Sequence, residues 1–169
     1  MKLIVCPLAE LDAALASCPS HVLSLLSPDA AIPPFPGIAA SRRLAKHFND
    51  INEPADGLTA ARDEDIADII AFARSWNGEA PFLAHCWAGI SRSTAAAYII
   101  ACLYGAEGAE EDHAHALRAA APEATPNPLM IALADDLLGR SGRMVRAIAE
   151  IGRGREAGRG NLFMLDIGG

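Results

Sequence analysis

The chain has 169 residues and a formal net charge of −7, from 21 acidic and 14 basic side chains. This length suits one compact domain, and the negative charge argues against nucleic acid or an anionic membrane as a partner. Four cysteines, Cys6, Cys18, Cys86 and Cys102, lack the paired spacing of a metal site or a disulfide framework, which favours the reducing cytoplasm. We therefore expect no metal and no cofactor, while the oligomeric state stays open.

The first half of the chain alternates apolar runs with a helical pattern. Residues 3–5 and 22–26 are short apolar runs typical of buried strands, and residues 9–18 between them favour a helix. A proline-rich loop follows, and a third strand is predicted over 44–48. The order strand, helix, strand predicts that the strands pair in parallel.

The second half is predicted to be mostly helical. Thr59 is a candidate cap for a helix that reaches Trp76, and residues 81–85 form a predicted strand that ends at Cys86. Four further helices are predicted at 93–104, 107–121, 128–138 and 143–151. The expected fold class is α/β, with a central, mainly parallel sheet of four or five strands flanked by helices and a helical C-terminal half.

The C-terminal residues differ in composition from the rest of the chain. Residues 152–160 are rich in glycine and arginine, which predicts a mobile linker. Residues 161–169 are apolar enough to dock, either as an edge strand or in an oligomer contact. The predicted organisation is a single α/β domain over 1–151, followed by a linker and an apolar tail over 152–169.

The residues from His85 to Ser93 read HCWAGISRS, between a predicted strand and a predicted helix. A tight loop that enters a helix points its backbone N–H groups inward, where the helix dipole adds positive charge. The five residues between Cys86 and Arg92 are enough to surround a tetrahedral anion, and the fork of Arg92 can bind two of its oxygens. Gly89 allows the tight turn. The predicted phosphate-binding residues are Trp87, Ala88, Gly89, Ile90, Ser91 and Arg92.

Cys86 is the candidate nucleophile of this loop. A cysteine pKa of about 8.5 falls by one to several units near a helix N-terminus and cationic groups, so the thiolate is expected at neutral pH. A thiolate below the phosphorus can attack in line and form a phosphocysteine. Ser93 is placed to donate a hydrogen bond to the sulfur when it leaves, and His85 is expected to support the loop through backbone hydrogen bonds.

This stretch resembles the signature loop of the protein tyrosine phosphatase superfamily, in which His-Cys, five residues, Arg and Ser or Thr form the phosphate cradle. Residues 88–93, AGISRS, resemble the dual-specificity branch in particular. Pro126-Asn127 at the start of a late helix is also similar to the family. The resemblance implies a dual-specificity-phosphatase-like fold and an Asp general acid on a loop upstream of the cysteine.

The loop over residues 48–57 holds the candidates for this acid. Asp50 directly follows a predicted strand and resembles the family position best. We expect it to protonate the leaving oxygen and then to activate water. Asp56, beside Gly57, is the second candidate, and Glu53 is the third.

We expect a phosphatase that hydrolyses phosphotyrosine in a phosphorylated protein or peptide. No Lys, Arg or His lies between Cys86 and Arg92, which disfavours multiply phosphorylated inositol headgroups. Whether phosphoserine and phosphothreonine are also substrates stays open, because this depends on the depth of the cleft. Trp87 either lines this pocket or packs against its own domain. Two alternatives are a pseudophosphatase that binds phosphate without turnover, and a thiol enzyme such as an arsenate reductase or a sulfur transferase. A redox partnership between Cys102 and Cys86 has no support in the sequence.

Overall fold

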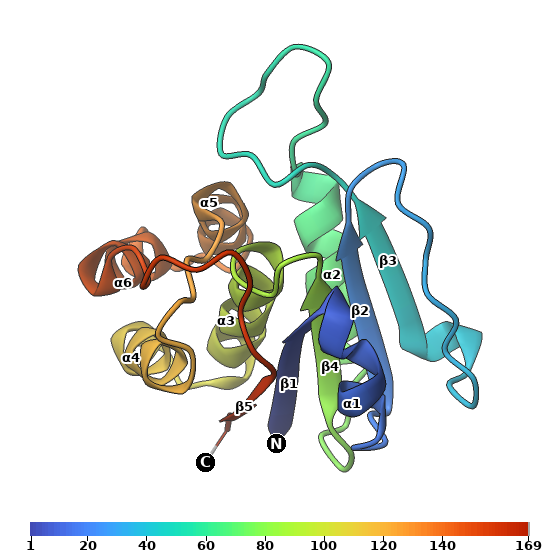
Figure 1. Ribbon diagram of the computed structural model, residues 1–169. Helices are drawn as coiled ribbons and strands as arrows, with labels where there is room; N and C mark the ends of the chain where they lie inside the picture. Colours follow the sequence, from blue (N-terminus) through green and yellow to red (C-terminus); the bar gives the residue numbers. More distant parts are fainter. Residues whose placement is uncertain (169) are drawn as a thin grey trace.

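A computed structural model describes residues 1–168 and contains one five-stranded sheet in the strand order β3-β2-β4-β1-β5 (Figure 1). Strands β1 to β4 pair in parallel, and β5 pairs antiparallel with β1 at one edge. The predicted α/β class, with a mainly parallel sheet of four or five strands, is confirmed. The strands are β1 (Lys2–Pro7), β2 (His21–Leu26), β3 (Arg43–His47), β4 (Phe82–Cys86) and β5 (Phe163–Asp166).

Helices cover both faces of the sheet (Figure 1). The larger core lies between the sheet and α2 to α6, and a smaller one lies on the other face under α1. Within residues 1–168, no helix is long and apolar enough to cross a membrane. The helices are α1 (Leu11–Leu15), α2 (Asp63–Arg74), α3 (Arg92–Tyr104), α4 (Glu110–Ala120), α5 (Pro128–Leu137) and α6 (Arg143–Ile151), with single turns at Leu8–Glu10 and Ala40–Arg42.

Helix α3 is enclosed at the centre of the larger core. Its side chains are buried without a break from Arg92 to Cys102, which is typical of a helix surrounded by other elements. It contacts β4 on the sheet side and α2, α4 and α5 on its other sides. This enclosure fixes the N-terminus of α3 next to the end of β4, where the anion loop was predicted.

Helix α2 begins three residues later than a cap at Thr59 would place it, so the assignment of Thr59 as its cap is wrong. The backbone N–H of Thr59 donates instead to Oδ1 of Asn49 (2.9 Å), and its carbonyl accepts from the N–H of Asn49 (2.7 Å). At the true start of α2, Oδ2 of Asp65 accepts from the N–H of Arg62 (3.0 Å). These two hydrogen bonds between Thr59 and Asn49 close the loop that carries Asp50.

The apolar C-terminal residues form the edge strand, which was one of the two open alternatives. Strand β5 pairs with β1 in a register that places Leu165 opposite Leu3. Phe163 and Leu165 are buried against the larger core, while Met164 between them is exposed. Residues 152–160, predicted as a mobile linker, are held against the rest of the chain by backbone hydrogen bonds.

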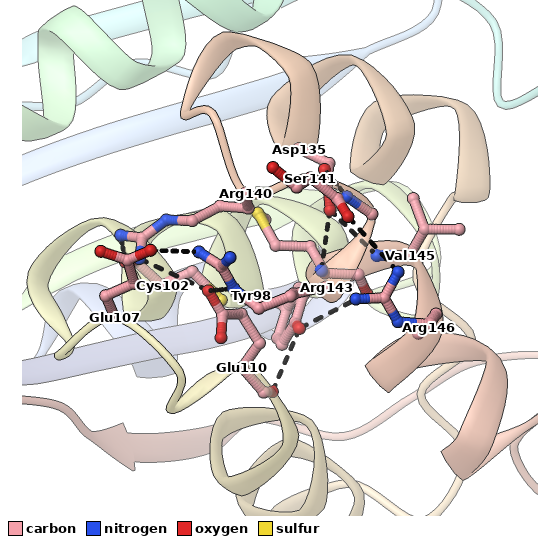
Figure 2. Close-up of polar contacts among 12 residues, drawn as sticks. Tyr98, Cys102, Glu107, Glu110, Asp135, Arg140, Ser141, Arg143, Val145 and Arg146 are labelled. Carbon is pink, nitrogen blue, oxygen red and sulfur yellow. Dashed lines mark hydrogen bonds and ion pairs between the residues drawn. The ribbon is translucent and has the colours of Figure 1, made fainter.

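Buried charges connect the C-terminal helices (Figure 2). Oε1 of Glu110, which is almost fully buried, lies 3.4 Å from Nη1 of Arg140 and 3.2 Å from Nε of Arg143. Nη2 of Arg140 also donates to the carbonyl of Cys102 in α3 (2.7 Å). Because both arginines share Glu110, the removal of this carboxylate would leave Arg140 without an ion pair to any residue from 1 to 168.

Asp135 in α5 caps the start of α6 (Figure 2). Its Oδ1 accepts from the N–H of Gly142 (2.5 Å), and its Oδ2 accepts from the N–H of Met144 (2.8 Å). The carboxylate is buried and lies at the helix end where a negative charge is favourable. One side chain thus fixes α6 against α5.

We expect Asp135→Asn to lower the free energy of unfolding by roughly 1–3 kcal/mol, because an amide replaces a buried charged acceptor. Urea unfolding followed by circular dichroism would measure the change. Asp136→Asn is the matched control, since Asp136 is the exposed neighbour. Equal stability of the two variants would contradict the capping role.

Candidate active site

The loop between β4 and α3 is held from outside through its carbonyl groups. Strand β4 ends at Cys86 and α3 begins at Arg92. With four carbonyls directed at surrounding chain, the loop amides are left for the concave side, where an anion can accept from them. Each of these carbonyls accepts from one backbone N–H group outside the loop. The pairs of carbonyl and N–H donor are Trp87 with Leu8 (3.3 Å), Ala88 with Gly160 (2.9 Å), Ile90 with Thr125 (2.9 Å) and Ser91 with Asn127 (3.4 Å).

Gly89 lets this loop close on the end of β1. Its φ is +71°, and a Cβ at this position would lie only 2.6 Å from the backbone nitrogen of Pro7. The turn therefore requires glycine both for its left-handed conformation and for its close approach to β1. On the other side of the loop, a Cβ on Gly160 would lie 2.8 Å from the carbonyl oxygen of Gly89.

The sulfur of Cys86 points into the loop. Its Sγ accepts a hydrogen bond from the backbone N–H of Gly89 (3.2 Å) and lies 3.1 Å from Oγ of Ser93. Cys86 is only 1% exposed, so the sulfur is enclosed by the loop and the surrounding core. Both contacts can stabilise negative charge on sulfur.

Arg92 lies in the first turn of α3 with its guanidinium beside the loop. Nη1 donates to the carbonyl of Phe48, just after β3 (2.8 Å), and Nε lies 3.8 Å from Oδ2 of Asp50. The side chain is buried, and within residues 1–168 its Nε has no hydrogen-bond partner. A buried guanidinium with donors to spare suits an anionic ligand.

Asp50 is the candidate acid that contacts the loop. Its Oδ1 accepts from Oγ of Ser91 (2.7 Å) and from Nδ2 of Asn127 (2.9 Å). The side chain is about one third exposed, and its other oxygen, Oδ2, lies beside Nε of Arg92. Asp56 and Glu53 are exposed in the same loop and make no hydrogen bond or ion pair with the residues that the structure describes.

Asn127 is a site residue whose role the sequence reasoning did not assign. Its Oδ1 caps α5 by accepting from the N–H of Met130 (3.0 Å), as its place before Pro128 indicates. Its Nδ2 donates both to Asp50 and to the carbonyl of Ile51 (3.2 Å). The likeness of Pro126-Asn127 to the phosphatase pattern was the one signal for this contact.

Trp87 directly follows the nucleophile and is 69% exposed, so it does not pack into its own domain. It lines a hollow of about 370 Å³ together with Leu8, Ala9 and Arg159. A wide apolar surface of this kind can contact a bound side chain. Among residues 1–168, no three His, Cys, Asp or Glu side chains group as metal ligands.

His85 precedes Cys86 in β4, so its side chain points to the opposite face of the sheet. It is fully buried in β4, and its Nε2 lies 2.7 Å from Oγ of Ser24 in β2. Burial lowers the pKa of His85 from 6.5 to about 4. The imidazole is therefore neutral at physiological pH, and its contact is with a side chain rather than with the backbone groups we expected.

The buried neutral His85 predicts a loss of stability in acid. Between pH 6.5 and about 4 the imidazole of His85 binds a proton in the unfolded chain but stays neutral in the folded chain. The free energy of unfolding therefore falls as the pH drops through this window, by on the order of 3 kcal/mol from His85 alone. Urea unfolding of His85→Gln at several pH values should show a flatter dependence than the wild type, and the exposed-site control His115→Gln should keep the wild-type slope. Identical slopes in all three proteins would contradict this account.

Two solved structures resemble this one over most of their length. The crystal structure of DUSP15 covers 88% of this chain and 90% of its own, with a TM-score of 0.61 and 22% sequence identity. The chain has the dual specificity phosphatase fold. A mouse protein assigned as a dual specificity phosphatase, solved in complex with zinc tungstate, aligns with a TM-score of 0.55 and 18% identity over 80% of this chain and 79% of its own. No family model and no curated protein matches the sequence.

This fold confirms the resemblance that the nine residues from His85 to Ser93 indicated. At this level of identity the likeness concerns the fold, so the chemistry rests on the residues of the chain itself. The dual specificity phosphatase fold brings four of the predicted residues together at the carboxyl end of β4, where α/β folds place their ligands. These residues are Cys86, Arg92, Ser93 and Asp50.

Proposed function

We propose that the protein is a phosphatase that hydrolyses phosphotyrosine monoesters through a phosphocysteine at Cys86. The observation that carries this proposal is the arrangement of the sulfur. Sγ of Cys86 meets a loop amide and the hydroxyl of Ser93, and Arg92 and Asp50 lie beside the same loop. An inert buried cysteine needs none of these polar neighbours.

Binding of the phosphoryl group falls to the loop amides and Arg92. The amides of residues 87–92 surround its oxygens, and the guanidinium bonds two of them in the plane of its fork. Nη1 of Arg92 is already oriented by the carbonyl of Phe48, so little side-chain freedom is lost on binding. The bound phosphorus then lies above Sγ of Cys86.

The reaction proceeds in two displacements at phosphorus. The Cys86 thiolate forms the S–P bond while the ester P–O bond breaks, and protonated Asp50 gives its proton to the departing phenolic oxygen. Water then attacks the phosphocysteine and breaks the S–P bond. Asp50 takes a proton from this water, and Ser93 donates a hydrogen bond to the leaving sulfur.

Phosphotyrosine is the preferred substrate class. The loop residues between Cys86 and Arg92 carry no cationic side chain, so the cradle suits one phosphoryl group rather than several. The exposed ring of Trp87 beside the nucleophile offers a surface for the phenyl ring. Phosphoserine and phosphothreonine peptides belong in the same assay, since their shorter side chains test the depth of the cleft.

A thiol reductase is disfavoured because the neighbouring thiols are unsuited to a relay. All four cysteines are free. Cys6 is paired in register with His85, and Pro7 with Cys86, so alternation along the strands directs Cys6 and Cys86 to opposite faces of the sheet. Burial raises the pKa of both Cys6 and Cys102 to about 12, which leaves them protonated and unreactive.

A phosphopeptide panel with acid quenching tests the proposal. We expect turnover of phosphotyrosine peptides and, after rapid quenching, a phosphorylated peptide that contains Cys86 in mass spectrometry. Binding of phosphopeptide without turnover would instead establish a pseudophosphatase. Turnover of arsenate or thiosulfate without hydrolysis of any phosphate ester would establish the thiol-enzyme alternative.

A further inference from the structure

The coil between α6 and β5, residues 152–162, runs past α3 along the outer side of the Cys86 loop (Figure 1). The N–H of Gly160 donates to the carbonyl of Ala88 (2.9 Å), and the N–H of Gly154 donates to Oγ1 of Thr125 (3.1 Å). At the end of the coil, Oε1 of the buried Glu123 accepts hydrogen bonds from both the backbone N–H and the side-chain amide of Asn161 (3.1 Å each). This C-terminal coil is therefore fixed against the site.

The C-terminal coil forms a wall of two hollows that reach the Cys86 loop at its two ends. The first, of about 550 Å³, includes Asp50 and Ser91 together with residues 153–157 of the coil. The second is the 370 Å³ hollow of Trp87 and Arg159. A peptide whose phosphorylated residue enters the cradle must continue on both sides of it, so its neighbouring residues would meet these hollows.

The coil carries three arginines and one glutamate in a chain whose net charge is −7. Arg153 and Arg159 are exposed and form no ion pair or hydrogen bond with any residue from 1 to 168. The side chain of Arg155 is 71% exposed, and its nearest carboxylate is Oε2 of Glu123, 3.8 Å away and buried. Three guanidinium groups are thus available beside the cradle.

The acidic groups of the first hollow are less available to a ligand, with one exception. Glu123 is buried and already holds Asn161, and Asp50 is engaged by Ser91 and Asn127. Glu156 is the exposed acid of the coil. It opposes the arginines, so its removal should act in the opposite direction from theirs.

We propose that the C-terminal coil selects phosphopeptides with acidic residues beside the phosphorylated one, with Arg155 and Arg159 as the selecting side chains. This inference rests on the proposed function. A guanidinium fork matches a carboxylate in two parallel hydrogen bonds. The rest of this negatively charged protein repels an acidic peptide, so a local cationic surface beside the cradle decides whether such a peptide is accepted.

The test compares kcat/KM for two phosphotyrosine peptides, one flanked by Asp and Glu and one flanked by Asn and Gln. Each rate is divided by the rate of the same variant on p-nitrophenyl phosphate, which has no flanking residues. We expect the wild type to prefer the acidic peptide roughly five- to tenfold at low salt, because exposed charge pairs are individually weak and screened. Arg155→Gln with Arg159→Gln should remove most of this preference, and Glu156→Gln should increase it.

Arg74→Gln is the matched control, since it removes one exposed positive charge at the end of α2 and should keep the wild-type preference. A wild type that turns over both peptides equally, or a double variant that keeps the preference, would overturn the role of the coil and leave the phosphatase proposal intact. Failure to hydrolyse any phosphate ester would overturn both.

Discussion

Replacement of Cys86 by serine is expected to lower the rate of phosphate-ester hydrolysis by on the order of 10⁴-fold or more, as loss of a catalytic nucleophile does in other enzymes. A serine hydroxyl is a much weaker nucleophile than a cysteine sulfur, and the other hydroxyl of the loop, that of Ser91, donates its hydrogen bond to Asp50. The amides and Arg92 remain, because the substitution changes one buried atom. Steady-state rates with p-nitrophenyl phosphate would measure the loss.

Binding distinguishes this outcome from a collapsed site. Titration calorimetry with a phosphotyrosine peptide should show that Cys86→Ser still binds, and tungstate, a tetrahedral oxyanion, should compete. Cys18→Ser is the control, because Cys18 is an exposed thiol away from the loop and its loss should leave the rate unchanged. A Cys86→Ser protein as active as the wild type would refute the phosphocysteine route.

The part of the site that lies within a few residues was predictable. Apolar runs and helical spacing predicted β4 and α3, and the loop between them followed because both ends were assigned. The contacts of Cys86 with Gly89 and Ser93 are local consequences of this turn. Structure within a few residues is determined by backbone hydrogen bonding and burial, and both leave a pattern in the local sequence.

The contacts across the chain were not predictable in the same way. Asn127 forms a hydrogen bond with Asp50, 77 residues away in the sequence, and Gly160 forms one with Ala88, more than 70 residues away. Their side-chain patterns are those of an ordinary helix cap and an ordinary flexible segment. Thr59 was misassigned for the same reason, since its backbone is used by Asn49 rather than by the helix it precedes. Such pairings follow from packing of the whole fold.

Substitution of Asp50 by asparagine is expected to lower kcat for phenyl phosphate by roughly 10²- to 10³-fold, the usual contribution of a general acid. Asparagine keeps an oxygen that can accept from Ser91 and Asn127, so the loop should retain its geometry. What is lost is the proton that the departing oxygen needs. Rates across a series of aryl phosphates would measure this, since a phenol that leaves readily as an anion needs no acid.

The loss should therefore shrink steadily as the leaving phenol becomes more acidic, and it should nearly vanish for a dinitrophenyl ester. A structural defect would lower all the rates in the series by the same factor. Asp56→Asn is the matched control: Asp56 lies six residues further along the same loop, is exposed and contacts no described part of the site. If Asp56→Asn showed the leaving-group dependence and Asp50→Asn did not, the acid would be reassigned to Asp56. The contact of Asp50 with Ser91 and Asn127 would then serve only to hold the loop.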